Sequence, residues 1–317
     1  MTVQILILVA SLVFLGFSAN YLVNASIRIA RKWHVSEMFI GLTIVALGTS
    51  APEIAVSAFA ALEGKGDLSI GNVIGSNIFN LGFILGLVAI ISPQIISKKM
   101  VYRDGLVLLS ATLMALFFMW DLKIVLWEGI MLLAALVSYL SFLWIKKDVE
   151  INQEDAAATG TWKDYLIFIV SLLVLVKSSE FTVSSATYIA EYFKISAWAI
   201  GATIVAAGTS LPELATSIIA TLKKKFGLSI GNVIGSDIFN TFGVIGISSV
   251  IAPIALEAKT FIFGFADSIF SVILLVATII LLLVFMRSGW KISRREGIII
   301  FLIALFRMAF EVYVGKM

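Results

Sequence analysis

The stretch LSIGNVIGSNIFN at residues 68–80 occurs a second time, as LSIGNVIGSDIFN at residues 228–240. Another motif precedes each copy, GTSAPEIAVS at 48–57 and GTSLPELATS at 208–217, so both motifs repeat with an offset of 160 residues (228 minus 68, and 208 minus 48). The four prolines of the chain pair at this offset as well: Pro52 with Pro212 and Pro93 with Pro253. A match this long and free of gaps indicates an internal duplication.

The composition indicates the class of protein. Of the 317 residues, 60% are hydrophobic and 14% are charged, and the mean hydropathy is +1.06, which is typical of an integral membrane protein. A membrane-spanning helix needs about 20 apolar residues. The first apolar stretch runs into IRIARK without a small-residue cleavage site, so we interpret it as a retained span. Ten stretches are long enough to span: 3–27, 37–61, 69–92, 104–121, 124–145, 164–189, 197–221, 229–253, 261–286 and 295–314.

Basic residues are distributed unequally between the predicted loops. The net charge is +3, and the loops on one predicted side hold sixteen Lys and Arg residues, against five on the other side. Two more, Lys177 and Arg307, fall within spans. Because basic residues concentrate in cytoplasmic loops, the sixteen define the inner side. The sequence thus predicts a multi-pass protein of the cell membrane with both termini extracellular.

Each copy of the repeat carries five predicted spans. An odd number of spans means that the second copy enters the membrane from the opposite side. The most polar connection, KKDVEINQEDAAATGTWK, separates the copies and is typical of a solvated cytoplasmic linker. We therefore predict an all-α polytopic membrane protein of ten transmembrane helices in two inverted five-helix repeats, with discontinuous helices 2 and 7. The predicted boundaries are 1–145 for the first repeat, 146–163 for the linker and 164–317 for the second, inverted repeat.

A proline and a glutamate adjoin in the middle of the second and seventh spans. The proline lacks an N–H and clashes with the preceding turn, which predicts helix breaks near Gly48 and Gly208. The carbonyls of residues 46–49 and 206–209 would lose their helical partners there. In lipid an unpaired carbonyl costs several kcal/mol, so such a break must line a cavity or meet another polar group. A bound cation is one such group.

The glutamates beside these prolines, Glu53 and Glu213, are candidate ion ligands. Each lies one helical turn after a threonine, Thr49 or Thr209, on the same helix face. Two carboxylates and two threonine carbonyls supply about six oxygens, and Ca²⁺ takes about 6–8. Mg²⁺ demands a stricter geometry, and softer transition metals are disfavoured because the chain has no cysteine and a single histidine. Intramembrane carboxylates are functional by default, so a purely structural role is the weaker interpretation.

The second motif supplies neutral oxygens. Ser76 shares a helix face with Asn80, and Ser236 shares one with Asn240. Such hydroxyl and amide oxygens suit a weakly bound monovalent ion such as Na⁺, and hydrogen bonds between helices are the alternative use. Asp237, which stands where the first copy has asparagine, is an extra carboxylate whose role stays open. Glycines four residues apart favour close helix packing in both copies: Gly71, Gly75, Gly231 and Gly235.

The duplicated motifs GTSAPE and GTSLPE, followed by GNVIGSNIFN and GNVIGSDIFN, resemble those of the calcium/cation antiporter superfamily, and within it the short prokaryotic sodium/calcium exchangers. The resemblance covers nearly the whole chain. It implies a Ca²⁺ site at the membrane centre with Glu53 and Glu213 as the main ligands. It also implies the helping groups: the carbonyls of Thr49 and Thr209, the side chains of Asn80 and Asn240, and, at flanking Na⁺ sites, the carbonyls of Ala46 and Ala206 with Ser76 and Ser236.

Two positions depart from the family pattern. Several relatives have aspartate where this chain has Asn240, which makes potassium coupling a weaker expectation. Asp237 stands where many relatives have asparagine, which leaves room for a proton or another cation in the cycle. The calcium/proton branch usually lacks the GTSxPE form, so the resemblance favours sodium coupling.

The expected function is secondary antiport of Na⁺ against Ca²⁺ by alternating access, with the first and sixth spans as the moving elements. The alternative is an antiporter coupled to H⁺ or dependent on K⁺. A cation channel is less favoured because channels usually gain symmetry by oligomerising around a pore, and an enzyme is less favoured because nucleophile-and-base arrangements are missing. The expected partners are Ca²⁺, Na⁺ and the lipid bilayer, with H⁺ left open. We expect no cofactor and no nucleic acid, and a monomer that suffices for transport.

Overall fold

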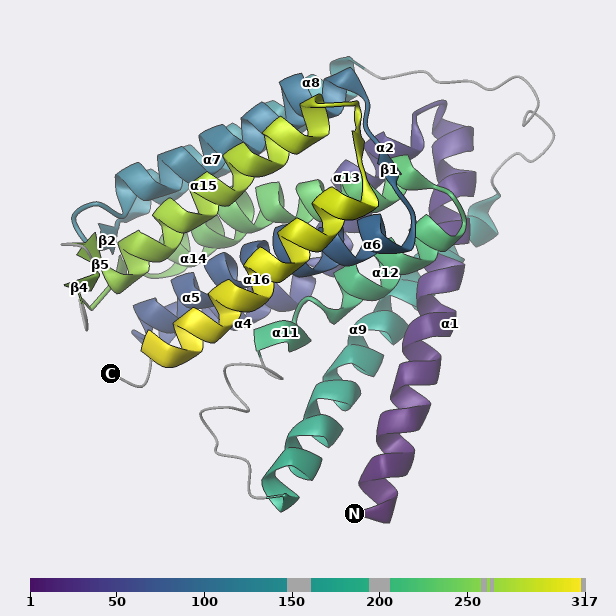
Figure 1. The fold of residues 1–317 in the computed structure, drawn as a ribbon, viewed down its shortest axis with the longest axis horizontal. Coiled ribbons are helices and arrows are strands. Elements are labelled where there is room, and N and C mark those ends of the chain that lie inside the picture. The colour runs from purple at the N-terminus through teal and green to yellow at the C-terminus, as the bar shows by residue number, and fades with distance from the viewer. Residues whose placement is uncertain (147–160, 194–205, 258–260, 263–264, 315–317) are drawn as a thin grey trace.

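The computed structural model describes residues 1–146, 161–193, 206–257, 261–262 and 265–314, and it is almost entirely helical (Figure 1). The α-helices are α1 (Thr2–Trp33), α2 (Glu37–Ile40), α3 (Ala46–Thr49), α4 (Ala51–Leu62), α5 (Gly66–Ile78), α6 (Leu85–Ile91), α7 (Leu106–Phe118), α8 (Leu126–Ile145), α9 (Trp162–Tyr192), α11 (Ala206–Gly208), α12 (Leu211–Leu222), α13 (Phe226–Ile238), α14 (Ile245–Ile251), α15 (Asp267–Arg287) and α16 (Arg294–Val314). Within the described residues, four π-helical segments join some of them: η1 (Gly41–Val45), η2 (Phe79–Ile84), η3 (Met100–Gly105) and η6 (Phe239–Val244).

The described part of the chain confirms a multi-pass helical membrane protein. Seven of its helical segments are long and apolar enough to cross a membrane, and there are eight if Glu37–Thr49 and Ala51–Leu62, which meet at 45°, form one span. The predicted linker, 146–163, and the predicted seventh span, 197–221, lie partly outside the described residues. The number of ten spans therefore stays a prediction.

The duplication in the sequence returns as a duplication of helices. α4 and α12 begin and end 160 residues apart, and so do α5 and α13, η2 and η6, and α6 and α14. Near-identical local sequences therefore fold into the same succession of α-helix, π-helix and α-helix. π-Helical turns are rare in proteins, and those that occur are frequent at functional sites. η2 and η6, which carry Asn80 and Asn240, therefore mark a candidate functional region.

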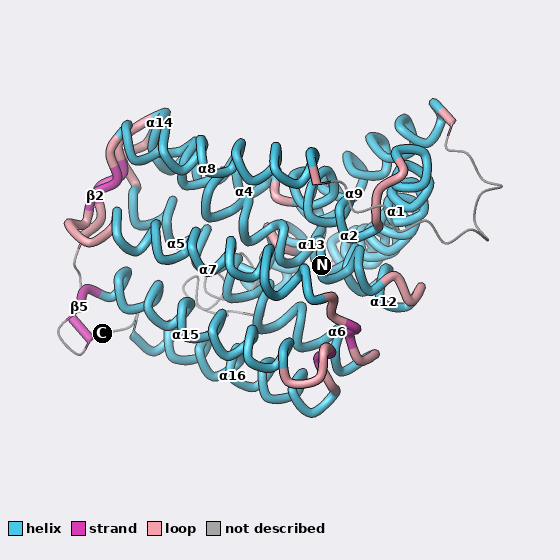
Figure 2. The backbone as a smooth tube through the Cα atoms, turned by 90° about the horizontal axis from the view of Figure 1, so that it is seen from above, coloured by secondary structure: helices cyan, strands magenta, loops and turns pink. Residues whose placement is uncertain are grey.

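The long helices α1 and α9 lie side by side at one end of the molecule (Figures 1 and 2). Near one end of the pair, Thr182 donates to Ser11 at 2.9 Å. Near the other end, Arg28 forms an ion pair with Asp164, and Trp33 donates to Tyr165 at 2.8 Å. Because low numbers in α1 meet high numbers in α9, the two helices run antiparallel.

Short strands tie the two halves of the sequence together at both ends of the helical body. β1 (Gln94–Ile95) pairs with β6 (Lys291–Ile292), and β2 (Lys123–Ile124) pairs with β3 (Ile254–Ala255), both antiparallel. In Figure 1, β1 and β2 lie at opposite ends of the body. A third antiparallel pair, β4 (Phe261–Ile262) with β5 (Phe265–Ala266), lies beside β2.

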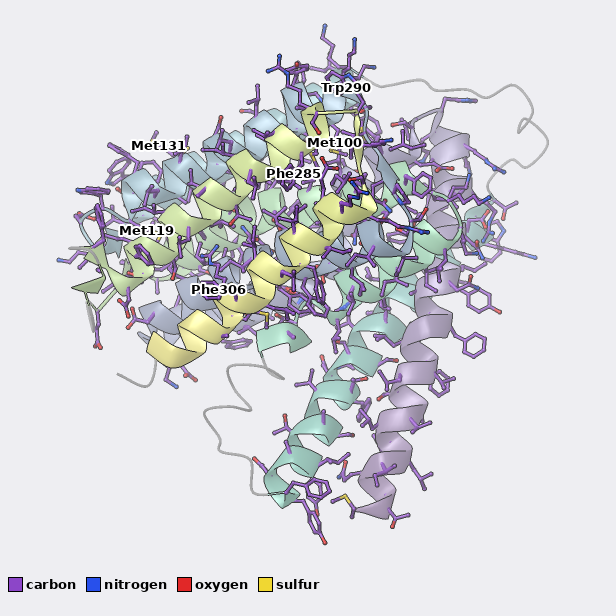
Figure 3. The ribbon with its side chains drawn as sticks, viewed as in Figure 1. Met100, Met119, Met131, Phe285, Trp290 and Phe306 are labelled. Carbon is purple, nitrogen blue, oxygen red and sulfur yellow. The ribbon has the colours of Figure 1, made fainter. Side chains whose placement is uncertain are left out.

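The distribution of polarity is that of a protein in lipid. Large apolar side chains cover the outer helices, such as Phe306, which is 74% exposed, and Met131, which is 46% exposed (Figure 3). The interior, by contrast, buries carboxylate, amide and hydroxyl side chains on α4, α5, α12 and α13. In lipid, buried polar groups of this kind face the bundle interior and mark functional sites.

Candidate ion-binding site

The helix that carries Glu53 is interrupted at Ser50, whose backbone (φ −80°, ψ 6°) leaves the helical conformation just before α4 begins. Ser210 (φ −91°, ψ 8°) interrupts the second copy in the same way, just before α12. Both breaks fall two residues beyond the predicted positions near Gly48 and Gly208. The reason is that proline is tolerated in the first turn of a helix, where its missing N–H would have no helical partner. Each proline therefore follows the break as the second residue of the new helix.

Fewer carbonyls are released at the breaks than predicted. The prediction that the Ala46 carbonyl loses its helical partner is wrong, because it accepts from the Ser50 N–H at 3.0 Å and from the Thr49 hydroxyl at 3.3 Å. A break two residues further along the chain leaves the hydrogen bond from the Ser50 N–H to the Ala46 carbonyl intact. The Gly208 carbonyl accepts instead from the Ser179 hydroxyl of α9 at 2.8 Å. The side chain of Ala206, the first residue of α11, lies outside the described residues.

The two glutamates lie in the first turns of α4 and α12, and both side chains are fully buried. Each accepts a hydrogen bond from the serine at the opposite break: Ser210 donates to Glu53 Oε1 at 3.1 Å, and Ser50 donates to Glu213 Oε1 at 3.3 Å. The two breaks therefore interlock, and each carboxylate is held by the half of the chain to which it does not belong.

The predicted serines and threonines surround these carboxylates. Ser76 of α5 donates to Glu53 Oε1 at 3.4 Å and contacts the Thr209 hydroxyl at 3.4 Å. The second copy repeats this pattern, since Ser236 donates to Glu213 Oε1 at 3.4 Å and contacts the hydroxyl of Thr49 at 3.4 Å. Each glutamate therefore has a hydroxyl from its own half and one from the other half within reach.

An amide layer adjoins the serines, about one helical turn further along the chain, where α5 and α13 continue into η2 and η6. Asn80 donates to Asp237 Oδ1 at 2.9 Å, and Asn240 donates to Asn77 Oδ1 at 3.1 Å. Asp237 and Asn77 are 160 residues apart in the sequence, so they hold equivalent places in this layer. The extra carboxylate thus binds the amide of a predicted ion ligand and leaves its second oxygen, Oδ2, without a hydrogen-bond partner among the described residues.

Five side-chain oxygens of this cluster are buried and lack a hydrogen-bond partner in the described part of the protein. They are Glu53 Oε2, Glu213 Oε2, Asn80 Oδ1, Asn240 Oδ1 and Asp237 Oδ2. A buried polar atom without a partner is costly, and a buried carboxylate even more so. No ion pair in the described residues neutralises either glutamate. A cation among these oxygens would offset both the lost hydrogen bonds and the buried charge.

The donor set is mixed in chemistry. Within the described residues, no group of three or more Asp, Glu, His or Cys side chains is placed to hold a metal ion. Binding therefore depends on hydroxyl, amide and carbonyl oxygens beside the two carboxylates, and such oxygens suit Ca²⁺ and Na⁺ better than transition metals.

Some residues of the site were not singled out from the sequence. Asn72 donates to Ser57 at 2.9 Å and to the Glu53 carbonyl at 3.4 Å, and Asn232 makes the equivalent bonds to Ser217 at 3.0 Å and to the Glu213 carbonyl at 3.4 Å. These asparagines fix the first turns of α4 and α12 against α5 and α13. The signal that could have found them was the duplication itself, because they and the serines at the breaks are identical in both copies.

A pair of buried carboxylates at interlocked helix breaks, surrounded by unpartnered oxygens in a multi-pass helical protein, defines a class: an ion-transporting membrane protein. Comparisons with known proteins agree. The family model described as sodium/calcium exchanger protein matches residues 3–145 and 163–313. The chain is 37% identical over 311 residues to CaxA of Alkalimonas amylolytica, which covers 95% of this chain and 96% of CaxA.

Two exchangers extend this likeness. The sodium/calcium exchanger MaX1 of Methanosarcina acetivorans is 35% identical over 355 residues, which covers 96% of this chain and 99% of MaX1. A solved structure of the sodium-calcium exchanger NCX_Mj matches with a TM-score of 0.84 at 32% identity, over 96% of this chain and 97% of that one. The chain therefore belongs to the sodium/calcium exchanger family. Its relatives are transporters, which confirms the prediction of a transporter and not an enzyme.

Proposed function

We propose that this protein is a secondary antiporter that exchanges Na⁺ for Ca²⁺ by alternating access. The observation that carries the proposal is the set of five buried oxygens without a hydrogen-bond partner in the described residues, contributed by both halves of the chain. Oxygen ligands that include two carboxylates suit Ca²⁺. MaX1 and NCX_Mj are named as sodium/calcium exchangers, which supports the same ions here.

The proposed ligands follow from the arrangement of the oxygens. Ca²⁺ binds between Glu53 and Glu213, with the carbonyls of Thr49 and Thr209 and the amide oxygens of Asn80 and Asn240. Na⁺ competes for the same carboxylates. At flanking sites it uses the hydroxyls of Ser76 and Ser236 and the carbonyls of Ala46 and Ala206. The Ala46 carbonyl gives up its hydrogen bond from the Thr49 hydroxyl when it binds the ion. Asp237 accepts a hydrogen bond from Asn80 and so holds this amide, whose Oδ1 has no hydrogen-bond partner among the described residues and is a candidate ligand.

A relay of hydrogen bonds sets the orientation of the Asn240 amide. The Thr241 hydroxyl donates to the Asp237 carbonyl at 2.8 Å, so its oxygen is free to accept from Asn77 Nδ2 at 2.9 Å. This fixes the Asn77 amide with its oxygen toward Asn240 Nδ2. The Asn240 oxygen is then the atom left for an ion.

We expect Thr241→Val to weaken Ca²⁺ binding about tenfold, the equivalent of one lost hydrogen bond of about 1.4 kcal/mol. Valine has the shape of threonine but cannot accept a hydrogen bond from Asn77. The Asn77 side-chain amide would then be free to rotate by half a turn, and the Asn240 amide would rotate with it, which turns its oxygen away from the ion. Calcium titration of the purified protein measures the affinity. Thr241→Ser, which keeps the hydroxyl, serves as the control, and equal affinities for the two variants would contradict the relay.

We further propose that the two halves, 1–145 and 164–317, are inverted five-helix repeats joined by the linker 146–163. Two observations support the inversion: the corresponding helices α1 and α9 run antiparallel, and the two sheets that join the halves lie at opposite ends of the body. The family model also matches the chain in two stretches, separated at the proposed linker. Ten spans and discontinuous helices 2 and 7 follow from this arrangement.

Contacts between loops support the proposed membrane orientation, with both termini extracellular. Lys225 forms an ion pair with Glu37 at 2.7 Å; Lys225 lies in a loop expected on the inner side, and Glu37 lies at the expected inner end of the second span. On the expected outer side, the Glu257 N–H donates to Asp67 at 3.0 Å. Each contact joins loops that the distribution of basic residues assigns to the same side.

Unequal exposure of the two halves supports alternating access. Leu68 at the start of α5 is 53% exposed, whereas Leu228, its counterpart in α13, is 1% exposed. Gly71 is likewise exposed and Gly231 is buried. A chain built from two similar halves can reach a second state in which these environments are exchanged. In our proposal the first and sixth spans, which correspond to α1 and α9, move between these states.

The proposed function is tested by calcium uptake into proteoliposomes loaded with Na⁺, Li⁺, K⁺ or choline at a fixed pH. We expect uptake only with internal Na⁺. If three Na⁺ exchange for one Ca²⁺, as the resemblance implies, one net charge moves per cycle, worth about 2.3 kcal/mol per 100 mV. An imposed potential then changes the uptake rate. Equal uptake with choline inside would contradict sodium coupling.

Coupling to H⁺ is the second candidate. The observation that favours it is the third buried carboxylate, Asp237, beside the two glutamates. The same liposomes under a proton gradient alone distinguish the candidates. Uptake that is driven by protons and does not depend on Na⁺ would show that H⁺ is the coupling ion. The proposed calcium ligands would remain the same.

A further inference from the structure

A group of exposed cations gathers around the β1–β6 sheet. Ile95 of β1 pairs with Lys291 of β6, which brings two loops together from different halves of the chain. Trp290 marks this end of the molecule in Figure 3, and side chains tipped with nitrogen project beyond it. The six exposed cations of these loops, hereafter the β1–β6 basic surface, are Lys98, Lys99, Arg287, Lys291, Arg294 and Arg295.

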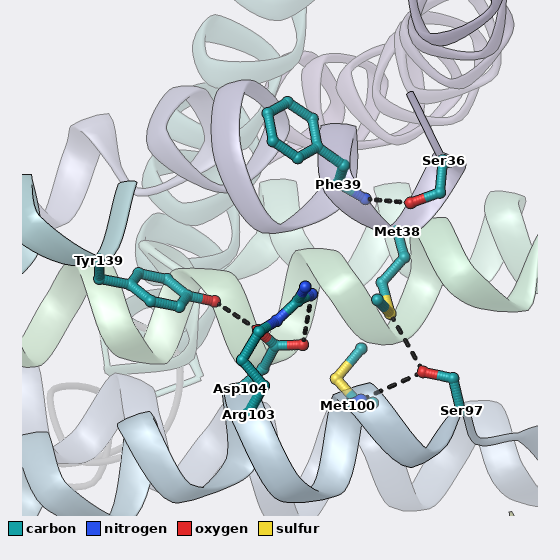
Figure 4. Close-up of polar contacts among 8 residues, drawn as sticks. All are labelled: Ser36, Met38, Phe39, Ser97, Met100, Arg103, Asp104 and Tyr139. Atoms are coloured by element: carbon teal, nitrogen blue, oxygen red, sulfur yellow. Dashed lines mark hydrogen bonds and ion pairs between the residues drawn. The ribbon is translucent and has the colours of Figure 1, made fainter. Parts of the chain in front are cut away.

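The two acids of the same loops are engaged with other groups. Asp104 is fully buried and accepts from Arg103 at 2.8 and 3.1 Å and from the Tyr139 hydroxyl at 2.9 Å (Figure 4). The Glu296 carboxylate accepts from Ser288 at 3.0 Å and from Ser293 at 2.7 Å, and among the six cations it interacts electrostatically with Lys291. The six cations therefore outnumber the two acids of these loops.

Arg287 stands in the last turn of α15, where a cation stabilises the helix, but helix stability does not explain where four of the other cations stand. Arg294 and Arg295 occupy the first turn of α16, and Lys98 and Lys99 precede the first turn of η3. Cations are disfavoured at helix N-termini, where the helix dipole is already positive. An anion placed between the two helix starts would offset this repulsion.

The corresponding sheet at the opposite end of the body serves as an internal comparison. The β2–β3 sheet has the same two-stranded construction, but its surroundings hold Asp67, Asp121 and Glu257 beside Lys123. Its turn contains Leu122 (φ 62°) where the β6 turn contains Trp290 (φ 53°). Neither the fold nor the turn therefore requires the basic surface or its tryptophan.

Aromatic and apolar side chains border the β1–β6 basic surface. The Lys98 ammonium lies 5.5 Å from the Trp290 ring centroid, and the Tyr102 ring packs edge-on against Trp290 at 5.9 Å. Beyond them, Val284 is 57% exposed and Ile298 is 45% exposed. Tryptophan and tyrosine of this kind sit at the level of lipid headgroups, with apolar side chains next to the acyl chains.

We propose that the β1–β6 basic surface binds the headgroup phosphates of anionic phospholipids. Clusters of several Lys and Arg residues next to membrane-spanning helices bind anionic lipids in this way. A soluble phosphate would use the cations but not the apolar border, so the structure favours the lipid. Because β1 and β6 come from different halves, a bound lipid bridges the two repeats.

The test compares phosphatidylglycerol with phosphatidylcholine, both added to detergent-purified protein and measured as retained lipid by native mass spectrometry. We expect retention of phosphatidylglycerol only, and no displacement by inorganic phosphate. Neutralising four of the cations, Lys98→Gln, Lys291→Gln, Arg294→Gln and Arg295→Gln, is expected to weaken phosphatidylglycerol binding at least about tenfold. Displacement by inorganic phosphate would overturn the assignment to lipid.

A matched variant removes the same charge elsewhere on the side expected to be cytoplasmic: Lys32→Gln, Lys146→Gln, Lys163→Gln and Lys224→Gln. We expect it to bind phosphatidylglycerol as the unmodified protein does. An equal loss of phosphatidylglycerol binding in both variants would mean that the lipid is attracted to the basic side of the protein in general. This result would overturn the proposal.

A single substitution tests the same proposal if the variant with four charge changes does not fold. Trp290→Leu places in the β6 turn the residue that Leu122 supplies in the corresponding turn, so the backbone conformation is tolerated. Loss of the cation–π contact with Lys98 is expected to weaken phosphatidylglycerol binding about threefold. Unchanged binding in a folded Trp290→Leu variant would contradict the role of the aromatic border.

Discussion

Glu213→Gln is expected to lower sodium-driven calcium uptake about 100-fold or more, and Glu53→Gln to do the same. Each substitution removes one of the two glutamate carboxylates from a fully buried site in which no ion pair between described residues replaces it. Removing one member of a buried, interacting charge set costs about 3 kcal/mol or more, which corresponds to about 100-fold in affinity. Uptake into proteoliposomes measures the loss of transport, and calcium titration of the purified protein measures the loss of affinity.

Glu63→Gln provides the matched control. Glu63 lies outside the spans, and the hydrogen bond and charge of the Lys65 ammonium, 2.6 Å away, lower its pKa below the usual range. It is therefore a charged glutamate, ten residues after Glu53, with no part in the proposed site. Wild-type uptake by the Glu213→Gln variant, or an equal loss of uptake in the Glu63→Gln variant, would contradict the assignment of the ion-binding site.

The sequence predicted those features of the fold that depend on local pattern. Repeated motifs predicted repeated helices, and α5 and α13 indeed begin and end 160 residues apart. Proline predicted a break in each copy, but its position was wrong by two residues, because a proline pattern does not distinguish the residue that breaks a helix from the residue that begins the next one. That distinction matters here, since the breaks fall on Ser50 and Ser210, which hold the glutamates of the opposite halves.

Contacts across the halves were beyond the reach of the sequence. Within one half, Ser76 and Glu53 were both predicted in the site from their motifs, and they are in contact. The contacts between the halves are different. That Asp237 binds Asn80 depends on how α5 approaches α13, and no spacing within either motif encodes that approach. The pairing of β1 with β6 has the same origin, because these residues are separated by almost 200 positions and are brought together only by the packing of the helices.

A second large effect, on stability, is expected from a substitution at Gly231. There α13 packs closely against α2 and η1. A Cβ added to Gly231 would lie 2.8 Å from the Met38 carbonyl oxygen and 3.2 Å from the Leu42 nitrogen, both backbone atoms. Backbone cannot move aside as a flexible side chain can. We expect Gly231→Val to lower the free energy of unfolding by about 3 kcal/mol, measured by thermal unfolding and by the yield of monodisperse protein.

Gly71, the counterpart of Gly231 in α5, makes this prediction a test of the transport cycle as well. A Cβ at Gly71 meets no described atom within 4 Å, so Gly71→Val is expected to fold with unchanged stability. If the two halves exchange environments during transport, Gly71 enters the tight contact that Gly231 makes here, and the added side chain prevents that state. We therefore expect Gly71→Val to bind Ca²⁺ normally and to lose exchange at least about tenfold, a barrier increase of about 1.4 kcal/mol. A Gly71→Val protein that exchanges at the wild-type rate would mean that α5 never packs as α13 does, and the proposed exchange of roles between the repeats would have to be abandoned.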